Sequence, residues 1–151
     1  MPTITPFLWF DHQAEDAMNL YTSIFPKSKT VSVNRAQGRV MSVEFELEGQ
    51  KFMAMNAGPA FKFNESISFF VACSSQEEID NLWSKLIAGG GEPSRCGWLK
   101  DKFGLSWQII PNTLGKMLGD SDGARSKRVM DAMLQMGKLD LDQLQRAYDG
   151  K

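Results

Sequence analysis

The stretch RVMSVEFELEGQKFMAMN, residues 39–56, begins with RVMSVEFELEG, the most regular alternation of apolar and polar side chains in the chain. Apolar side chains stand at every second position of its first half: Met41, Val43, Phe45 and Leu47. A period of two predicts a strand with one buried face. Glu48-Gly49-Gln50 predicts a turn into KFMAMN, so the stretch is expected to form two consecutive antiparallel strands, closing near Gly58-Pro59.

The preceding residues predict a strand, a helix and another strand. Ile4 to Phe10 is a short apolar and aromatic run typical of a buried strand. Asp11 is expected to cap a helix whose apolar residues repeat at helical spacing until Pro26. KTVSVNRA, residues 29–36, then predicts a strand before the hairpin.

The second half of the chain repeats this order. SISFFVAC, residues 66–73, predicts a strand, and either Ser74 with Glu77 or Ser75 with Glu78 offers a capping box for the next helix. Three glycines, residues 89–91, end that helix, and residues 92–111 supply two or three short strands. The two halves therefore repeat the same order of elements, and the linker NAGPAFKFNE joins them.

The last part of the chain changes to helical periodicity. Val129, Met133 and Met136 form one stripe, with Met130 and Leu134 beside it. Asp140, with Gln143 three residues later, predicts the cap of a final helix. We expect one domain, residues 1–151, composed of a first module (1–58), a second module (66–111) and a helical tail (113–148). The tail packs either on its own chain or on a second subunit.

Composition excludes several classes of partner. Seventeen Lys and Arg against eighteen Asp and Glu give a net charge of −1, so neither a nucleic acid nor a membrane surface is expected to bind. Two cysteines are too few for a disulfide framework. No signal-peptide pattern or long apolar run is present, and a cytoplasmic location is expected. The single histidine, His12, argues against a His-rich metal site and is expected to be an exposed turn residue.

Several segments resemble a known family. They are FLWFD, AEDAMNLYTSIFPKSK, FKFNESISFFV, EEIDNLWSKL, CGWLKDKFGLSWQIIP and KRVMDAMLQMGKLDLDQLQRAY. They are similar to the PhnB-like, 3-demethylubiquinone-9 3-methyltransferase branch of the vicinal oxygen chelate superfamily, also called the glyoxalase/bleomycin-resistance fold. The resemblance implies an α+β fold of two paired βαβββ modules, a mixed sheet curled around a shared cavity, C-terminal helices and, in many members, a homodimer.

The resemblance also implies where metal-using members place His and Glu ligands. Gln108 stands where such members have Glu, and Ser68 stands on or next to the expected His. The other two positions fall near Phe52 or Ala54, and near Ile4 or Thr5. No carboxylate or imidazole occurs at these positions, so no metal and no cofactor are expected. Glu44 and Glu46 face either the cavity or water.

Other chemistry finds little support in the residues. No Gly-rich loop follows a first strand to hold S-adenosylmethionine. Cys96 is the best candidate nucleophile, although a small half-buried cysteine is the simpler interpretation. Asp101 is expected to bond its own backbone at a turn.

These observations favour a metal-free protein that binds a small apolar or aromatic molecule. The ligand-binding residues predicted for it are Asn56, Ser68, Trp98 and Gln108. The alternative is an enzyme, either a methyltransferase acting on a demethylubiquinone-type substrate or a metal-dependent lyase or dioxygenase with relocated ligands. A third interpretation is a dimeric scaffold whose cavity its own side chains fill.

Overall fold

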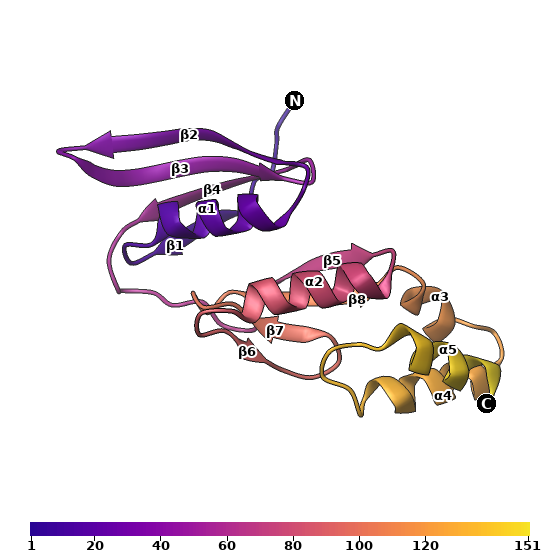
Figure 1. Ribbon diagram of the computed structural model, residues 1–151. Coiled ribbons are helices and arrows are strands. Elements are labelled where there is room, and N and C mark those ends of the chain that lie inside the picture. The colour runs from indigo at the N-terminus through magenta and orange to yellow at the C-terminus, as the bar shows by residue number, and fades with distance from the viewer. The chain divides into compact units, whose positions relative to one another are not determined.

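Each half of the chain folds into a four-stranded mixed sheet with one helix packed on it (Figure 1). The computed structural model describes residues 1–151, which separate into two units, residues 1–62 and 63–151. The first unit contains β1 (Phe7–Phe10), α1 (Ala14–Ile24), β2 (Ser28–Ala36), β3 (Arg39–Leu47) and β4 (Gln50–Asn56). The second contains β5 (Ser68–Cys73), α2 (Gln76–Ile87), β6 (Glu92–Pro93), β7 (Trp98–Lys100) and β8 (Ser106–Pro111). Three further helices of the second unit follow: α3 (Leu114–Leu118), α4 (Gly123–Met133) and α5 (Leu141–Asp149).

The two sheets have the same topology. Their strand orders are β1-β4-β3-β2 and β5-β8-β7-β6. In each sheet the first strand pairs in parallel with the last one, and the remaining pairs are antiparallel. The predicted α+β fold with two βαβββ modules and C-terminal helices is thereby confirmed. The curl of the sheets around a shared cavity stays a prediction.

The core of the first unit lies between α1 and one face of its sheet. Val43, Phe45 and Phe52 are buried there, and the rings of Phe45 and Phe52 stack with centroids 5.4 Å apart. Tyr21 of α1 is 1% exposed and lies against Phe45, 6.2 Å between ring centroids. The alternation of residues 39–47 therefore selects the face of β3 that α1 covers.

The start of α1 differs from the prediction. Asp11 is not the cap: the capping residue is Gln13, whose side chain makes no capping hydrogen bond. The Ala14 N–H donates instead to Oδ1 of Asn56, at 2.9 Å. Because β4 ends beside the first turn of α1, the side-chain carbonyl of Asn56 accepts a free helical N–H. A capping side chain next to the helix in sequence usually accepts such an N–H. The first strand also begins later than expected, at Phe7.

The helix of the second unit follows its sequence signals. Ser75 caps α2 by accepting the Glu78 N–H at 3.1 Å, which confirms the second of the two predicted capping pairs. The Glu78 carboxylate reaches back to the Ser74 hydroxyl at 2.8 Å. Ile79, Leu82, Trp83 and Leu86 are the buried residues of α2.

Gly91 is expected to tolerate no side chain. A Cβ there would lie 2.6 Å from Ile87 Cα and 2.7 Å from the Lys100 carbonyl oxygen, and backbone atoms cannot rotate away. Gly91→Ala should therefore lower the free energy of unfolding by about 1–3 kcal/mol in urea denaturation. Gly123→Ala is the matched control, because nothing lies within 4 Å of a Cβ at that position. Equal stability of the two variants would contradict the close approach.

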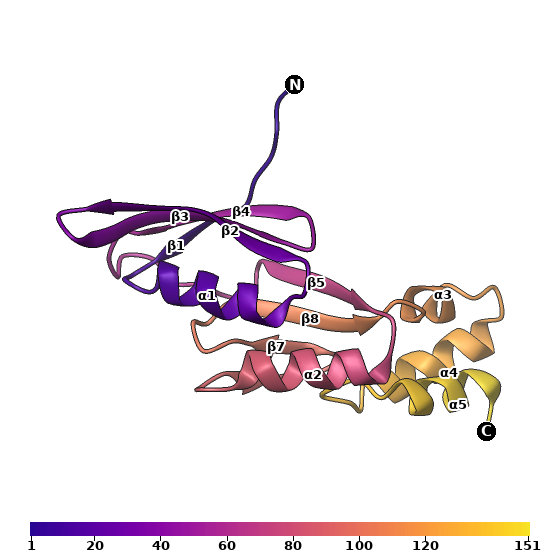
Figure 2. The ribbon, with the colours of Figure 1, turned by 45° about the horizontal axis from the view of Figure 1, so that its top comes forward.

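The tail packs on the second unit of its own chain (Figure 2). Its core consists of Ile110, Leu114, Met117, Val129, Leu139 and Leu144. The Gln76 amide donates to the Leu139 carbonyl at 3.0 Å and accepts the Leu141 N–H at 2.7 Å. The first of the two alternatives, in which the tail packs on its own chain, is therefore confirmed. None of the helices has the length and apolar character that crossing a bilayer requires.

The predicted stripe on the tail is divided between core and surface. Met133 and Met136 are half-buried against the tail core, next to the buried Val129. Met130 and Leu134 are 40% and 47% exposed. Asp140 caps α5 by accepting the Gln143 N–H at 3.0 Å, as predicted.

Candidate functional site

The face of the second sheet away from α2 gathers most of the predicted site residues. Ser106 and Gln108 of β8 lie on the face opposite to Trp107, which is 2% exposed on the side of the helix α2. Lys100 and Trp98 of β7 stand opposite Ser106 and Gln108 in the register. On the other side of β8, Ser68 and Phe70 of β5 stand opposite the same two residues.

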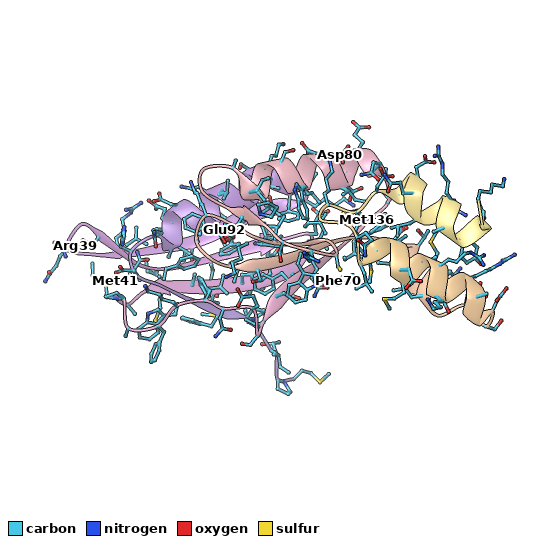
Figure 3. The ribbon with its side chains drawn as sticks, turned by 90° about the horizontal axis from the view of Figure 1, so that it is seen from below. Arg39, Met41, Phe70, Asp80, Glu92 and Met136 are labelled. Atoms are coloured by element: carbon cyan, nitrogen blue, oxygen red, sulfur yellow. The ribbon has the colours of Figure 1, made fainter.

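Three of the four predicted ligand-binding residues therefore come together. Gln108 is the central one: its Nε2 donates to Ser68 Oγ at 2.9 Å, and Trp98 is its register partner on β7. All three side chains are half-buried. Phe70 on β5 lies on the side of the sheet away from α2, the helix that carries Asp80 (Figure 3). The Phe70 side chain is 61% exposed.

Asn56 belongs to the first unit, at the end of β4. Its carboxamide accepts the Ala14 N–H and donates to the Val40 carbonyl at 3.1 Å, so it joins β4 to α1 and β3. It also borders a hollow of about 580 Å³ that is lined by His12 and by the charged side chains of Asp11, Glu15, Asp16, Arg35 and Arg39. Arg35 and Glu15 form an ion pair at 2.6 Å in that hollow. The predicted exposed position of His12 is confirmed.

Sequence reasoning did not select Ser106 as a site residue. Its side chain is 1% exposed, and its hydroxyl oxygen has no hydrogen-bond partner. The signal was available, because Ser106 and Gln108 are two residues apart on one strand and share a face. A buried hydroxyl without a partner is unusual enough to require an explanation.

A second feature that the sequence did not reveal is an ion pair between Lys100 and Glu65. Glu65 lies in the segment before β5, and Lys100 lies at the end of β7, so the pair joins the two sides of β8 at the level of Ser106. The hydrogen bond from Lys100 holds the pKa of Glu65 below its usual value, and the same bond raises the pKa of Lys100.

The face of the first sheet away from α1 carries Glu44 and Glu46. Their register partners on β4 are Met53 and Lys51. Each carboxylate lies near a lysine: Glu46 is 3.4 Å from Lys29 Nζ, and Glu44 is 4.0 Å from Lys51 Nζ. The two glutamates are therefore turned away from the helix and held in charge pairs.

The register corrects two of the positions that the resemblance implied for metal ligands. Phe52 and Ala54 are buried on the α1 side, so the outward-facing residues of β4 are Met53 and Met55. Ile4 and Thr5 precede β1, and the outward-facing residues there are Phe7 and Trp9, the register partners of Met53 and Met55.

The donor set at these positions does not fit a divalent metal. Thioethers, aromatic rings, a serine hydroxyl and a glutamine amide replace the expected carboxylates and imidazoles. Within either unit, no three His, Cys, Asp or Glu side chains converge on a point that could hold a metal.

Asp101 organises the hairpin between β7 and β8. It is 3% exposed, and its Oδ1 accepts the N–H groups of Phe103 and Leu105 at 2.9 and 3.1 Å. Its Oδ2 accepts the indole N–H of Trp107 at 2.9 Å. The prediction that Asp101 bonds its own backbone is confirmed, and the carboxylate is fully used in the hairpin.

The cysteines lie in structural positions. Burial, reinforced by the nearby charge of Glu78, raises the pKa of Cys73 to about 11, which keeps its thiol protonated. Cys96 is half-buried in the loop before β7, where its N–H donates to the Met136 carbonyl at 2.8 Å. The simpler interpretation of Cys96 fits this position, because a helix N-terminus that would activate the thiol is missing there.

Duplicated βαβββ units of this topology define a protein of the glyoxalase/bleomycin-resistance fold. A glyoxalase-related enzyme from Fulvimarina pelagi has a TM-score of 0.53 at 14% identity, over 76% of this chain and 91% of its own. The sequence model of the 3-demethylubiquinone-9 3-methyltransferase family matches residues 2–110, and the chain belongs to that family. The matched residues end at Ile110, so α3, α4 and α5 lie beyond them.

Solved structures agree with this assignment. A PhnB protein from Bacillus cereus, described as a candidate 3-demethylubiquinone-9 3-methyltransferase, is 36% identical, with a TM-score of 0.68 over 73% of this chain and 99% of its own. A protein from Pseudomonas aeruginosa is 19% identical, with a TM-score of 0.58 over 71% of this chain and 95% of its own. No curated protein matches the sequence significantly.

Proposed function

We propose that the protein binds a small, largely apolar or aromatic molecule without a metal, against the face of β5, β8 and β7 that points away from α2. The observation that carries this proposal is the bond from Gln108 to Ser68 beside Trp98. Gln108 and Ser68 stand where the resemblance implies a Glu and a His as metal ligands, and Trp98 lies beside Gln108. They offer hydrogen bonds and an aromatic surface in place of charge.

The chemistry of these groups suits recognition of such a molecule. A carboxamide and a hydroxyl orient a ligand through hydrogen bonds, while Trp98 and Phe70 supply apolar area on either side of Gln108. Metal-assisted chemistry has no support in the donor set described above. Binding is therefore favoured over metal-dependent lyase or dioxygenase activity.

We expect a screen of small aromatic compounds by thermal shift to find ligands that raise the melting temperature. At a ligand concentration about 100 times Kd, the stabilisation is about 2.7 kcal/mol. Gln108→Ala should weaken that binding about tenfold, since the Gln108 carboxamide contributes about one hydrogen bond. Gln135→Ala, an exposed glutamine on the tail, is the control. A broad screen without any stabilising compound would contradict the proposal.

Methyl transfer is a second candidate, favoured by the description of the family alone. The chain has no Gly-rich nucleotide loop after its first strand. Calorimetric titration with S-adenosylmethionine separates the two functions. Saturable binding that Gln108→Ala leaves unchanged would favour the transferase. The predicted homodimer is a separate property, which light scattering of the purified protein measures.

A further inference from the structure

The buried hydroxyl of Ser106 is the starting point. Within this structure it is the one buried side-chain polar atom that lacks a hydrogen-bond partner. Leaving such a group unpaired costs free energy, and a bound molecule is one of the explanations that such a site calls for. Ser106 lies on the same face as Gln108, one step along β8.

A second hydroxyl donor lies beside it. Ser68 is the register partner of Ser106 on β5, and Ser68 Oγ accepts a hydrogen bond from Gln108. A hydroxyl that accepts one bond keeps its own hydrogen for donation. The central and flanking strands therefore present two O–H donors next to each other.

A cation completes the row. Lys100 is the register partner of Ser106 on the other side of β8, so the order across the sheet is Lys100, Ser106, Ser68. One ammonium and two hydroxyls within a row offer N–H and O–H donors side by side, which suits the binding of a carboxylate.

A carboxylate of the protein itself already contacts this cation. Glu65 pairs with Lys100, and the Glu65 side chain is 59% exposed. Exposed ion pairs contribute little free energy, because water screens them. Glu65 can therefore leave Lys100 at small cost when a better-placed anion arrives.

The next row along the sheet is suited to an apolar group. Trp98 and Phe70 stand on either side of Gln108, one step from Lys100 and Ser68. A molecule with a carboxylate at the first row would place its body at the second.

We propose that Lys100, Ser106 and Ser68 bind the carboxylate of a small organic acid, and that Glu65 takes the place of that carboxylate on Lys100 in the unliganded protein. The apolar body of the acid lies against Trp98 and Phe70. This inference rests on the proposed function and adds the charge of its ligand. The interaction that raises the pKa of Lys100 and lowers that of Glu65 agrees with it.

The test compares acids with their amides, which have the same shape and no charge. Benzoate, 2-naphthoate and decanoate are titrated by calorimetry beside benzamide, 2-naphthamide and decanamide. We expect at least one acid to bind about tenfold or more tightly than its amide, since charge-assisted hydrogen bonds are roughly twice as strong as neutral ones.

Variants assign the preference to named residues. Lys100→Met should abolish the preference for acid over amide, while Lys100→Arg should keep most of it because the charge remains. Glu65→Gln should tighten binding of the acid about two- to fivefold by removing the competing carboxylate, without affecting the amide. Asp131→Asn, which breaks the exposed Lys127–Asp131 pair on α4, is the control and should change neither.

The outcomes separate this inference from the proposed function. Equal binding of acids and amides would overturn the carboxylate subsite and leave the proposed function standing. Binding of neither class would overturn both. A preference for acids that survives Lys100→Met would also overturn the subsite.

Titration of the Glu65 carboxyl by NMR gives an independent readout. Its pKa is lowered while it contacts Lys100. On saturation with the bound acid, the pKa should rise toward the ordinary glutamate value, because Glu65 has left the cation. An unchanged Glu65 pKa in the saturated protein would contradict the exchange of carboxylates.

Discussion

Asp101→Ala is expected to lower the free energy of unfolding by about 3–5 kcal/mol, the largest single-residue effect outside the apolar core. The substitution removes the acceptor of three hydrogen bonds, from the N–H groups of Phe103 and Leu105 and from the indole of Trp107. The Asp101 side chain is 3% exposed, so water cannot replace the carboxylate at all three donors. Urea denaturation followed by circular dichroism measures the change.

Asp101→Asn separates the backbone bonds from the indole bond. An asparagine oxygen can still accept from Phe103 and Leu105, while its NH₂ group cannot accept from Trp107. We expect a loss intermediate between wild type and Asp101→Ala. Trp107→Phe in the Asp101→Asn background should then add less than it does in the wild type, because the indole bond is already absent. Strictly additive losses would contradict the shared hydrogen bond.

Gly97→Ala should destabilise the protein by about 3 kcal/mol, from backbone strain and overpacking together. Gly97 has a φ of +85°, and a Cβ there would lie 2.7 Å from Ile110 Cδ1 and 3.0 Å from the Ile109 carbonyl oxygen. Its N–H also donates to the Gly137 carbonyl at 2.8 Å, which holds the tail. Amide hydrogen exchange should show the largest loss of protection in α4 and α5.

Gly104→Ala provides the matched control for Gly97→Ala. Gly104 has a similar φ of +88°, but nothing lies within 4 Å of a Cβ there. The Gly104→Ala variant should therefore lose only the part of its free energy of unfolding that backbone strain removes, about 1–2 kcal/mol. If both variants lose the same stability, close packing at Gly97 is not the reason for a glycine there.

Local signals predicted the fold well. Alternation in residues 39–47 identified β3 and its buried face, since only one of its two sets of side chains is apolar. The same rule left β4 undecided, because Phe52, Met53, Ala54 and Met55 are all apolar and either set suits a core. The face of β4 became clear only from its pairing with β3.

The features that define the candidate site depend on contacts between distant residues. Lys100 of β7 meets Glu65, which precedes β5, because both of these strands pair with β8, and no local pattern predicts that order. Asn56 provides a similar case: its hydrogen bond to the start of α1 joins residues 42 positions apart in sequence, and no local pattern predicts it. Gln108 and Ser68 were found from the resemblance, and their mutual hydrogen bond was not predicted.

Ile110, which belongs to the tail core, closes one end of the proposed site. It follows Gln108 on the same face of β8, yet its side chain is 6% exposed because the tail helices cover it. A molecule bound at Gln108 therefore has no room to extend toward Ile110, where the tail helices pack. Removing the bulk of the tail core at that end should admit longer molecules, so we expect the helices that follow the matched family region to limit the length of a molecule bound at the proposed site.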